Sequence, residues 1–232
     1  MHRHFEEELD RIRATILAMA GLVERCLEDV TRALTQGDAS VARAVIEADD
    51  AIDAYEVEID RLATELIVRH QPTAADLRFV VAAIKLGPEL ERIGDNAVNI
   101  ARRVLDLAGT KPVKPLIDLP RMLHLARAMV SDAIAAYVAR DSRAARGIIA
   151  RDDEVDQLYL QIFRELLTFM IEDPRTITGA IDLIFVARFA ERIADQATNI
   201  CEEVVYLVDG TPIRHQPLED VGGVRGEVKG ET

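Results

Sequence analysis

Four pairs of acidic residues, each spaced four positions apart, are the residues in this chain whose types and spacing could do chemistry. They are Asp49/Asp53, Glu91/Asp95, Asp152/Asp156 and Glu191/Asp195. Residues four apart lie on one face of a helix, and like charges there destabilise the helix slightly, so helix stability does not explain the pairs. An all-oxygen donor set of this kind suits hard cations such as magnesium, calcium, manganese or iron.

The positions of the pairs predict that they meet in two sets of four. A helical hairpin that turns at residues 72–73 brings the first two pairs to one level on antiparallel helices, and a turn at Pro174 does the same for the last two. Four carboxylates at one level repel each other unless some are protonated or a cation joins them. A solvated acidic helix face is the ordinary explanation for a single pair. The occurrence of two aligned pairs in both halves of the chain favours a metal site in each half.

The chain contains an internal repeat. Residues 91–100 (ERIGDNAVNI) match residues 191–200 (ERIADQATNI) at seven of ten positions, and DDAID at 49–53 corresponds to DDEVD at 152–156. Self-similarity of this kind indicates a duplication. We expect a first repeat at residues 1–112, a second at residues 113–212, and a flexible, Gly-rich and charged tail at residues 213–232.

Each half is expected to form three long helices. In the first half they run over residues 5–36, 39–71 and 73–109, and apolar residues recur at heptad spacing in the second of them. Short turns make neighbouring helices antiparallel. The predicted fold class is therefore all-α, with two tandem three-helix bundles related by pseudo-twofold symmetry. On the third helix, Glu91 and Asp95 lie away from the apolar stripe, which predicts that they are exposed.

Composition excludes several classes of function. The 28 Lys and Arg residues and 41 Asp and Glu residues give a net charge of −13, which disfavours nucleic acid and anionic membranes as partners. No apolar run reaches the length that crosses a bilayer, and the start has no apolar signal-peptide segment, so a cytoplasmic location is expected. The two cysteines and five histidines have no metal-ligand spacing. No Gly-rich phosphate loop is present.

Two groups of motifs resemble a known family. QPTAADLR at 71–78, followed by LERIGDNAVNIA at 90–101, is similar to the first half of the PhoU family, the accessory and regulatory proteins of the phosphate-specific transport system. EDPR at 172–175, AERIADQATNI at 190–200 and VYLVDG at 205–210 resemble its second half. The resemblance extends over residues 5–212.

The resemblance implies two three-helix repeats with metal clusters, of iron or zinc, at E/D-x-x-x-D motifs that fall on the four acidic pairs. Magnesium or manganese also suits oxygen donors. It implies a cytoplasmic, usually homodimeric and non-enzymatic regulator. Its implied partners are the ATPase of the phosphate ABC transporter and a membrane sensor histidine kinase, through which the family represses the phosphate-starvation response. Asn96 and Gln196 stand where the family commonly has His.

Two alternatives compete with a metal-binding regulator. A carboxylate-bridged dimetal enzyme would use Glu-x-x-His pairs inside a helical bundle, and this chain has no such pair. A helical scaffold without metal is the other alternative. The halves also differ: the acidic stripe of the first continues as Glu56 and Asp60, where the second has Tyr159 and Phe163. Because added carboxylates attract cations, we expect the first site to hold metal more tightly.

Overall fold

The computed structural model describes residues 2–110 and 112–213, with side chains from residue 4 onward. Within these residues the chain forms eight α-helices and one short 3-10 turn, and no strand. The helices are α1 (His2–Gln36), α2 (Ala39–Glu47), α3 (Asp49–His70), α4 (Ala74–Leu107), α5 (Asp118–Ala139), α6 (Ser142–Ile149), α7 (Asp152–Glu172) and α8 (Ile177–Asp209), with the 3-10 turn η1 (Pro174–Thr176). The expected tail lies outside the described residues, except for Ile213, which is buried.

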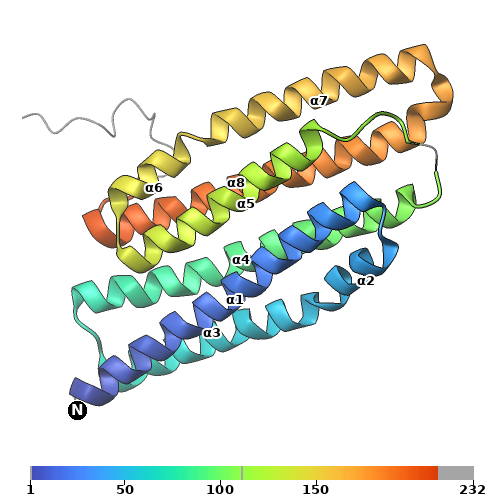
Figure 1. Ribbon diagram of the computed structural model, residues 1–232. Helices are drawn as coiled ribbons and strands as arrows, with labels where there is room; N and C mark the ends of the chain where they lie inside the picture. Colours follow the sequence, from blue (N-terminus) through green and yellow to red (C-terminus); the bar gives the residue numbers. More distant parts are fainter. Residues whose placement is uncertain (1, 111, 214–232) are drawn as a thin grey trace, which may run out of the picture.

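The helices lie side by side in one elongated bundle (Figure 1). α4 and α8, one from each half, pack against each other at its centre. α1 packs on α4 and α5 on α8, while α3 and α7 lie on opposite outer edges. The all-α fold with two tandem three-helix repeats is therefore confirmed, and the repeats meet along the α4–α8 pair.

The second helix of each repeat is broken, although the sequence pattern predicts one continuous helix there. α2 ends before Ala48 and α3 starts at Asp49; α6 ends before Ala150 and α7 starts at Asp152. Neither break contains Gly or Pro, so the usual breakers are absent. An acidic first turn is favourable because the free N–H groups there carry partial positive charge. The first carboxylate of each predicted set thus begins a helix.

The connections fix the level of the acidic residues. α3 ends at His70, the following residue Gln71 adopts the left-handed conformation (φ 45°), and α4 begins at Ala74. In the second repeat, the Asp173 side chain accepts a hydrogen bond from the Arg175 backbone N–H at 3.1 Å and so caps the 3-10 turn before α8. Both turns lie where the sequence placed them, so the helices run antiparallel in the predicted register.

One helix departs from the expectation that no apolar segment reaches bilayer-spanning length. By length and composition alone, α5 is long and apolar enough to cross a membrane. Half of its most apolar 18-residue window is buried inside the protein, and the helix packs against α8 and α1. α5 is therefore packed as a core helix of the bundle.

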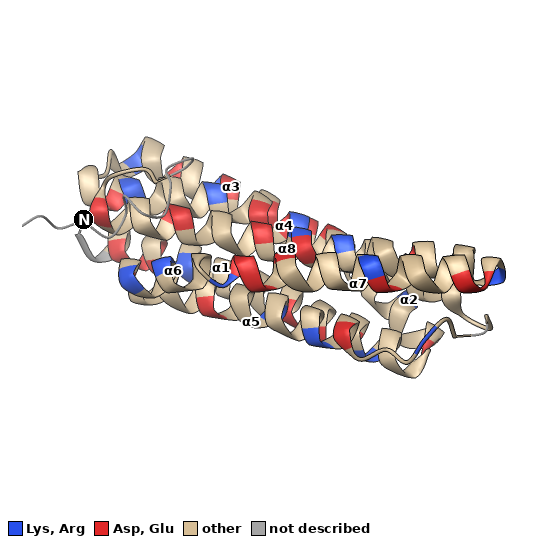
Figure 2. Ribbon diagram, turned by 90° about the horizontal axis from the view of Figure 1, so that it is seen from above, with Lys and Arg blue, Asp and Glu red and all other residues tan. Residues whose placement is uncertain are grey.

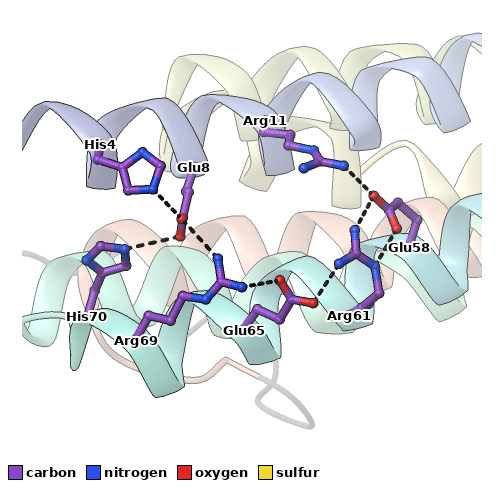
Figure 3. A network of polar contacts seen from close by, with 8 residues as sticks. All are labelled: His4, Glu8, Arg11, Glu58, Arg61, Glu65, Arg69 and His70. Carbon is purple, nitrogen blue, oxygen red and sulfur yellow. Dashed lines mark hydrogen bonds and ion pairs between the residues drawn. The ribbon is translucent and has the colours of Figure 1, made fainter.

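A chain of ion pairs joins α1 to α3 along the bundle edge (Figure 3). At one end, Glu8 of α1 lies 3.3 Å from His4 and 3.2 Å from His70. At the other end, Arg11 donates to Glu58 of α3 at 2.9 Å. Arg69, Glu65 and Arg61 link the two ends. Although no sequence spacing paired His4 with His70, they meet because the hairpin brings the ends of α1 and α3 together.

Close packing of α3 on α4 depends on Gly94. A Cβ atom added there would lie 2.8 Å from Cδ1 and 3.3 Å from Cγ2 of Ile52. The second repeat has Ala194 and Val155 at the corresponding positions. Compared with the first repeat, the glycine position gains one methyl group and the isoleucine position loses one, so the summed side-chain volume is conserved.

This exchange predicts a compensating pair of substitutions. Gly94→Ala is expected to destabilise the protein by about 1 kcal/mol, because overpacking costs about 1–3 kcal/mol while the helix propensity of Ala returns about 1 kcal/mol. Adding Ile52→Val should restore most of the loss, although Ile52→Val alone also destabilises by about 1 kcal/mol. Urea unfolding of the four proteins measures the coupling. Strictly additive effects would show that the two positions do not share this space.

Candidate metal centres

The first carboxylate cluster consists of Asp49 and Asp53 on α3 with Glu91 and Asp95 on α4. The structure brings all four close enough for their charges to interact. Burial, followed by repulsion from Asp95 and Asp53, raises the pKa of Asp49 above its usual range. Burial, then repulsion from Asp95, Glu56 and Asp53, raises the pKa of Glu91 to about 7. The cluster therefore carries negative charge that the surrounding protein does not fully compensate.

The second carboxylate cluster repeats this arrangement with Asp152 and Asp156 on α7 and Glu191 and Asp195 on α8. Burial, then repulsion from Asp195, Asp156 and Glu191, raises the pKa of Asp152 to about 7. The pKa values of Glu191 and Asp195 are raised as well, mainly by burial. All eight predicted ligands thus fall into two groups of four at equivalent positions of the repeats.

The expected exposure of Asp95 is confirmed, whereas that of Glu91 is wrong, because its side chain is half-buried. Asp53, Asp95 and Asp156 are exposed. Five are half-buried, because the neighbouring antiparallel helix covers part of each side chain: Asp49, Glu91, Asp152, Glu191 and Asp195. Periodicity on a single helix could not reveal this cover, since it comes from the partner helix.

The donor chemistry of both clusters fits a hard cation. Every donor is a carboxylate oxygen, and in the second cluster Oε2 of Glu191 is buried without a hydrogen-bond partner. Among the described side chains, however, no group of three or more His, Cys, Asp or Glu residues is drawn together tightly enough to hold a metal ion. The exposed carboxylates would have to change rotamer to complete the coordination of an ion, which single-bond rotation permits.

The two clusters have different surroundings. Glu56, whose charge acts on Glu91, adds a fifth carboxylate to the first cluster. The equivalent residue in the second repeat is Tyr159, and the Arg188 guanidinium lies over its ring, 5.8 Å from the centroid. Arg188 also pairs with Glu191. The second cluster is therefore partly neutralised by a direct ion pair, whereas Arg102 and Arg92 act on Asp49 and Glu91 of the first cluster through their charges. Asp60 is not among the groups that shift the pKa of Asp49 or Glu91.

The asparagines one turn beyond the acidic pairs do not complete these clusters. Asn199 donates from Nδ2 to Glu89 of α4 at 3.1 Å, so its side chain crosses to the other repeat. Asn99 accepts from Arg102 at 3.2 Å through its Oδ1 atom. Asn96 is buried and donates to the Arg92 carbonyl oxygen at 2.8 Å.

Polar contacts across the α4–α8 pair were not predicted from the sequence. Lys85 donates to both carboxylate oxygens of the buried Glu203, at 3.1 and 2.8 Å. Arg103 donates to the buried Asp182 at 3.0 Å. Acidic and basic segments are interspersed along α3, α4, α8 and α7 when the bundle is seen from above (Figure 2). These contacts fasten the repeats to each other and hold the two clusters in a fixed relation.

A family model described as the PhoU domain matches residues 16–104 and again residues 119–204. The two matches cover a large part of each repeat. The chain belongs to the PhoU family. The motif-based resemblance is thereby confirmed, and the two-repeat PhoU architecture accounts for the internal duplication.

Several named relatives match almost the whole chain. The "phosphate-specific transport system accessory protein PhoU homolog" of Aquifex aeolicus is 40% identical over 216 residues, covering 93% of this chain and 98% of that protein. The homolog of the same name from Caulobacter vibrioides is 41% identical over 221 residues, covering 94% and 96%.

Solved PhoU structures share the fold. The crystal structure of PhoU from Pseudomonas aeruginosa superposes with a TM-score of 0.86 at 39% identity, over 89% of this chain and all of that one. The phosphate transport system regulatory protein PhoU from Streptococcus pneumoniae gives a TM-score of 0.83 at 28% identity, over 90% and 98%.

Proposed function

We propose that this chain is a metal-binding regulator of phosphate uptake. The observation that carries the metal part is the pair of equivalent carboxylate clusters, each built from two antiparallel helices and each with raised pKa values. Uncompensated negative charge at a half-buried site is what a bound cation would relieve. Iron or zinc is the ion that the family suggests, and magnesium or manganese also suits oxygen donors.

The regulatory part rests on the relatives, which are named accessory proteins of the phosphate-specific transport system. On this basis the chain acts in the cytoplasm as an adaptor between the ATPase of the phosphate ABC transporter and a sensor histidine kinase. It represses the phosphate-starvation response when phosphate is plentiful. A homodimer is its proposed assembly. No enzymatic step is proposed, because the acidic residues lie along helix edges and the chain lacks a Glu-x-x-His motif.

Co-purification with the transporter ATPase tests the adaptor role. The full-length tagged chain, co-expressed with the ATPase of its phosphate transporter, is expected to retain that ATPase on the affinity column. An ATPase from an unrelated ABC transporter serves as the control and should wash through. Elemental analysis of the same eluate is expected to find a transition metal or magnesium. Absence of the ATPase from the eluate would count against the adaptor role. Catalytic turnover by this chain purified alone, if lost with Glu91→Ala, would point to the dimetal enzyme.

A further inference from the structure

A pocket of about 380 Å³ opens where α4 of the first repeat meets α8 of the second. Its lining side chains are all charged or carry amides: Arg92, Asp95, Asn96, Asn99, Arg188, Arg192, Asp195 and Gln196. It lies between the two carboxylate clusters and shares one aspartate with each. A volume of this size accommodates a small ion together with several water molecules.

The pocket follows the internal symmetry of the chain. Positions 92, 95 and 96 of α4 recur 100 residues later as positions 192, 195 and 196 of α8, and both sets line the same pocket. It therefore lies at the pseudo-twofold axis, and neither repeat forms it alone. Arg188 enters additionally from α8, where the first repeat has Pro88.

Three guanidinium groups at one pocket are unexpected in a chain of net charge −13. Arg92 pairs with Glu89 at 3.1 Å, and Arg188 pairs with Glu191. Within the described residues, Arg192 has no hydrogen-bond or ion-pair partner, although its charge acts on Glu191 and Asp195. Its donors are therefore available to a ligand.

The mixture of donors and acceptors defines the class of that ligand. Guanidinium and amide N–H groups hydrogen-bond the oxygens of a tetrahedral oxyanion. The carboxylate oxygens of Asp95 and Asp195 can accept hydrogen bonds, and Oε1 of Gln196 is a buried acceptor with no partner. A fully ionised oxyanion such as sulfate would be repelled by the carboxylates. An oxyanion that keeps a proton donates that O–H to one of them.

We infer that this pocket binds a protonated tetrahedral oxyanion, namely inorganic phosphate, between the arginines of the two repeats. The choice of phosphate among such ions rests on the proposed function, whereas the site itself rests on the pocket and its lining. Binding joins α4 to α8 through a shared ligand, so phosphate would stabilise the interface between the repeats. The competing explanation is that the arginines only offset the charge of the clusters.

Isothermal titration calorimetry with inorganic phosphate tests the inference. Full-length protein dialysed against a chelator is titrated at constant ionic strength, so that bound metal cannot account for the heat. One phosphate is expected to bind per chain. Arg192→Gln should weaken that binding by at least about tenfold, because a charge-assisted donor pair is lost. Arg164→Gln on α7 makes the same charge change away from the pocket and should leave the affinity within about twofold.

Sulfate and metal content complete the test. Sulfate is expected to bind at least about tenfold more weakly than phosphate. Asp195→Asn should reduce this difference in affinity between the two ions. Three results would overturn the inference: no phosphate binding by the chelated protein, equal weakening by both arginine variants, or sulfate binding as tightly as phosphate. Metal content and ATPase association are measured on a portion of each preparation that has not been dialysed against the chelator. If those are normal while phosphate does not bind, the pocket assignment fails and the proposed function stands.

Discussion

Replacing Glu91 and Asp95 together by alanine is expected to abolish metal binding at the first carboxylate cluster and to leave the protein fully helical. Two of the four proposed ligands are lost, and two carboxylates of one helix are too few to retain the ion. The fold should survive because Asp95 is exposed, Glu91 is half-buried, and alanine is the strongest helix former. Elemental analysis measures the loss of metal, and circular dichroism checks the helix content.

The equivalent variant Glu191→Ala with Asp195→Ala is the matched control, and the two are expected to differ. The first cluster has Glu56 as an added carboxylate, whereas Arg188 pairs with Glu191 in the second. Removing the first pair should therefore eliminate the tighter class of sites in a competition with a chelator. Removing the second pair should eliminate the weaker class. Full metal content in the first variant would show that the proposed ligands are wrong, and equal affinities in the two would refute the asymmetry.

The sequence was sufficient to place the clusters because their geometry depends on local signals. Gln71-Pro72 and Asp173-Pro174 mark the two turns, and counting residues outward from them predicts which acids come level. The core stripe and the all-α class follow from the same periodicity. The breaks at Ala48 and Ala150 escaped prediction because neither contains a residue that opposes helix formation.

The relation between the repeats could not be predicted in the same way. Arg103 and Asp182 are 79 positions apart and Lys85 and Glu203 are 118 apart, so their contacts depend on how α4 lies against α8. The sequence contains no turn that fixes this register. The ion pair of Arg188 with Glu191 could have been predicted from the sequence, because residues three positions apart on a helix are neighbours and opposite charges there attract.

Metal-free protein is expected to lose stability as the pH rises from about 4 to about 7, in the opposite sense to a protein held by salt-bridged carboxylates. The pKa of Glu91 is raised from its usual 4.5 to about 7, and that of Asp152 from 3.8 to about 7. Between the unfolded and folded pKa values, the native state binds protons that the unfolded chain has released. Its stability therefore falls with rising pH, and the penalty is complete above about pH 7.

Substitution isolates this effect from that of the other carboxylates. After allowance for solvent screening of these partly exposed groups, Glu91→Gln with Asp152→Asn should stabilise the chelated protein by about 1–2 kcal/mol at about pH 8. At about pH 4 the gain should be near zero, because both carboxyls are then largely protonated in the native protein. Urea unfolding at the two pH values gives the difference. Because a bound cation neutralises the same charges, metal should stabilise the wild type at the higher pH more than it stabilises this variant, which has lost one carboxylate from each cluster. A gain that is equal at both pH values would mean that repulsion within the clusters does not limit stability.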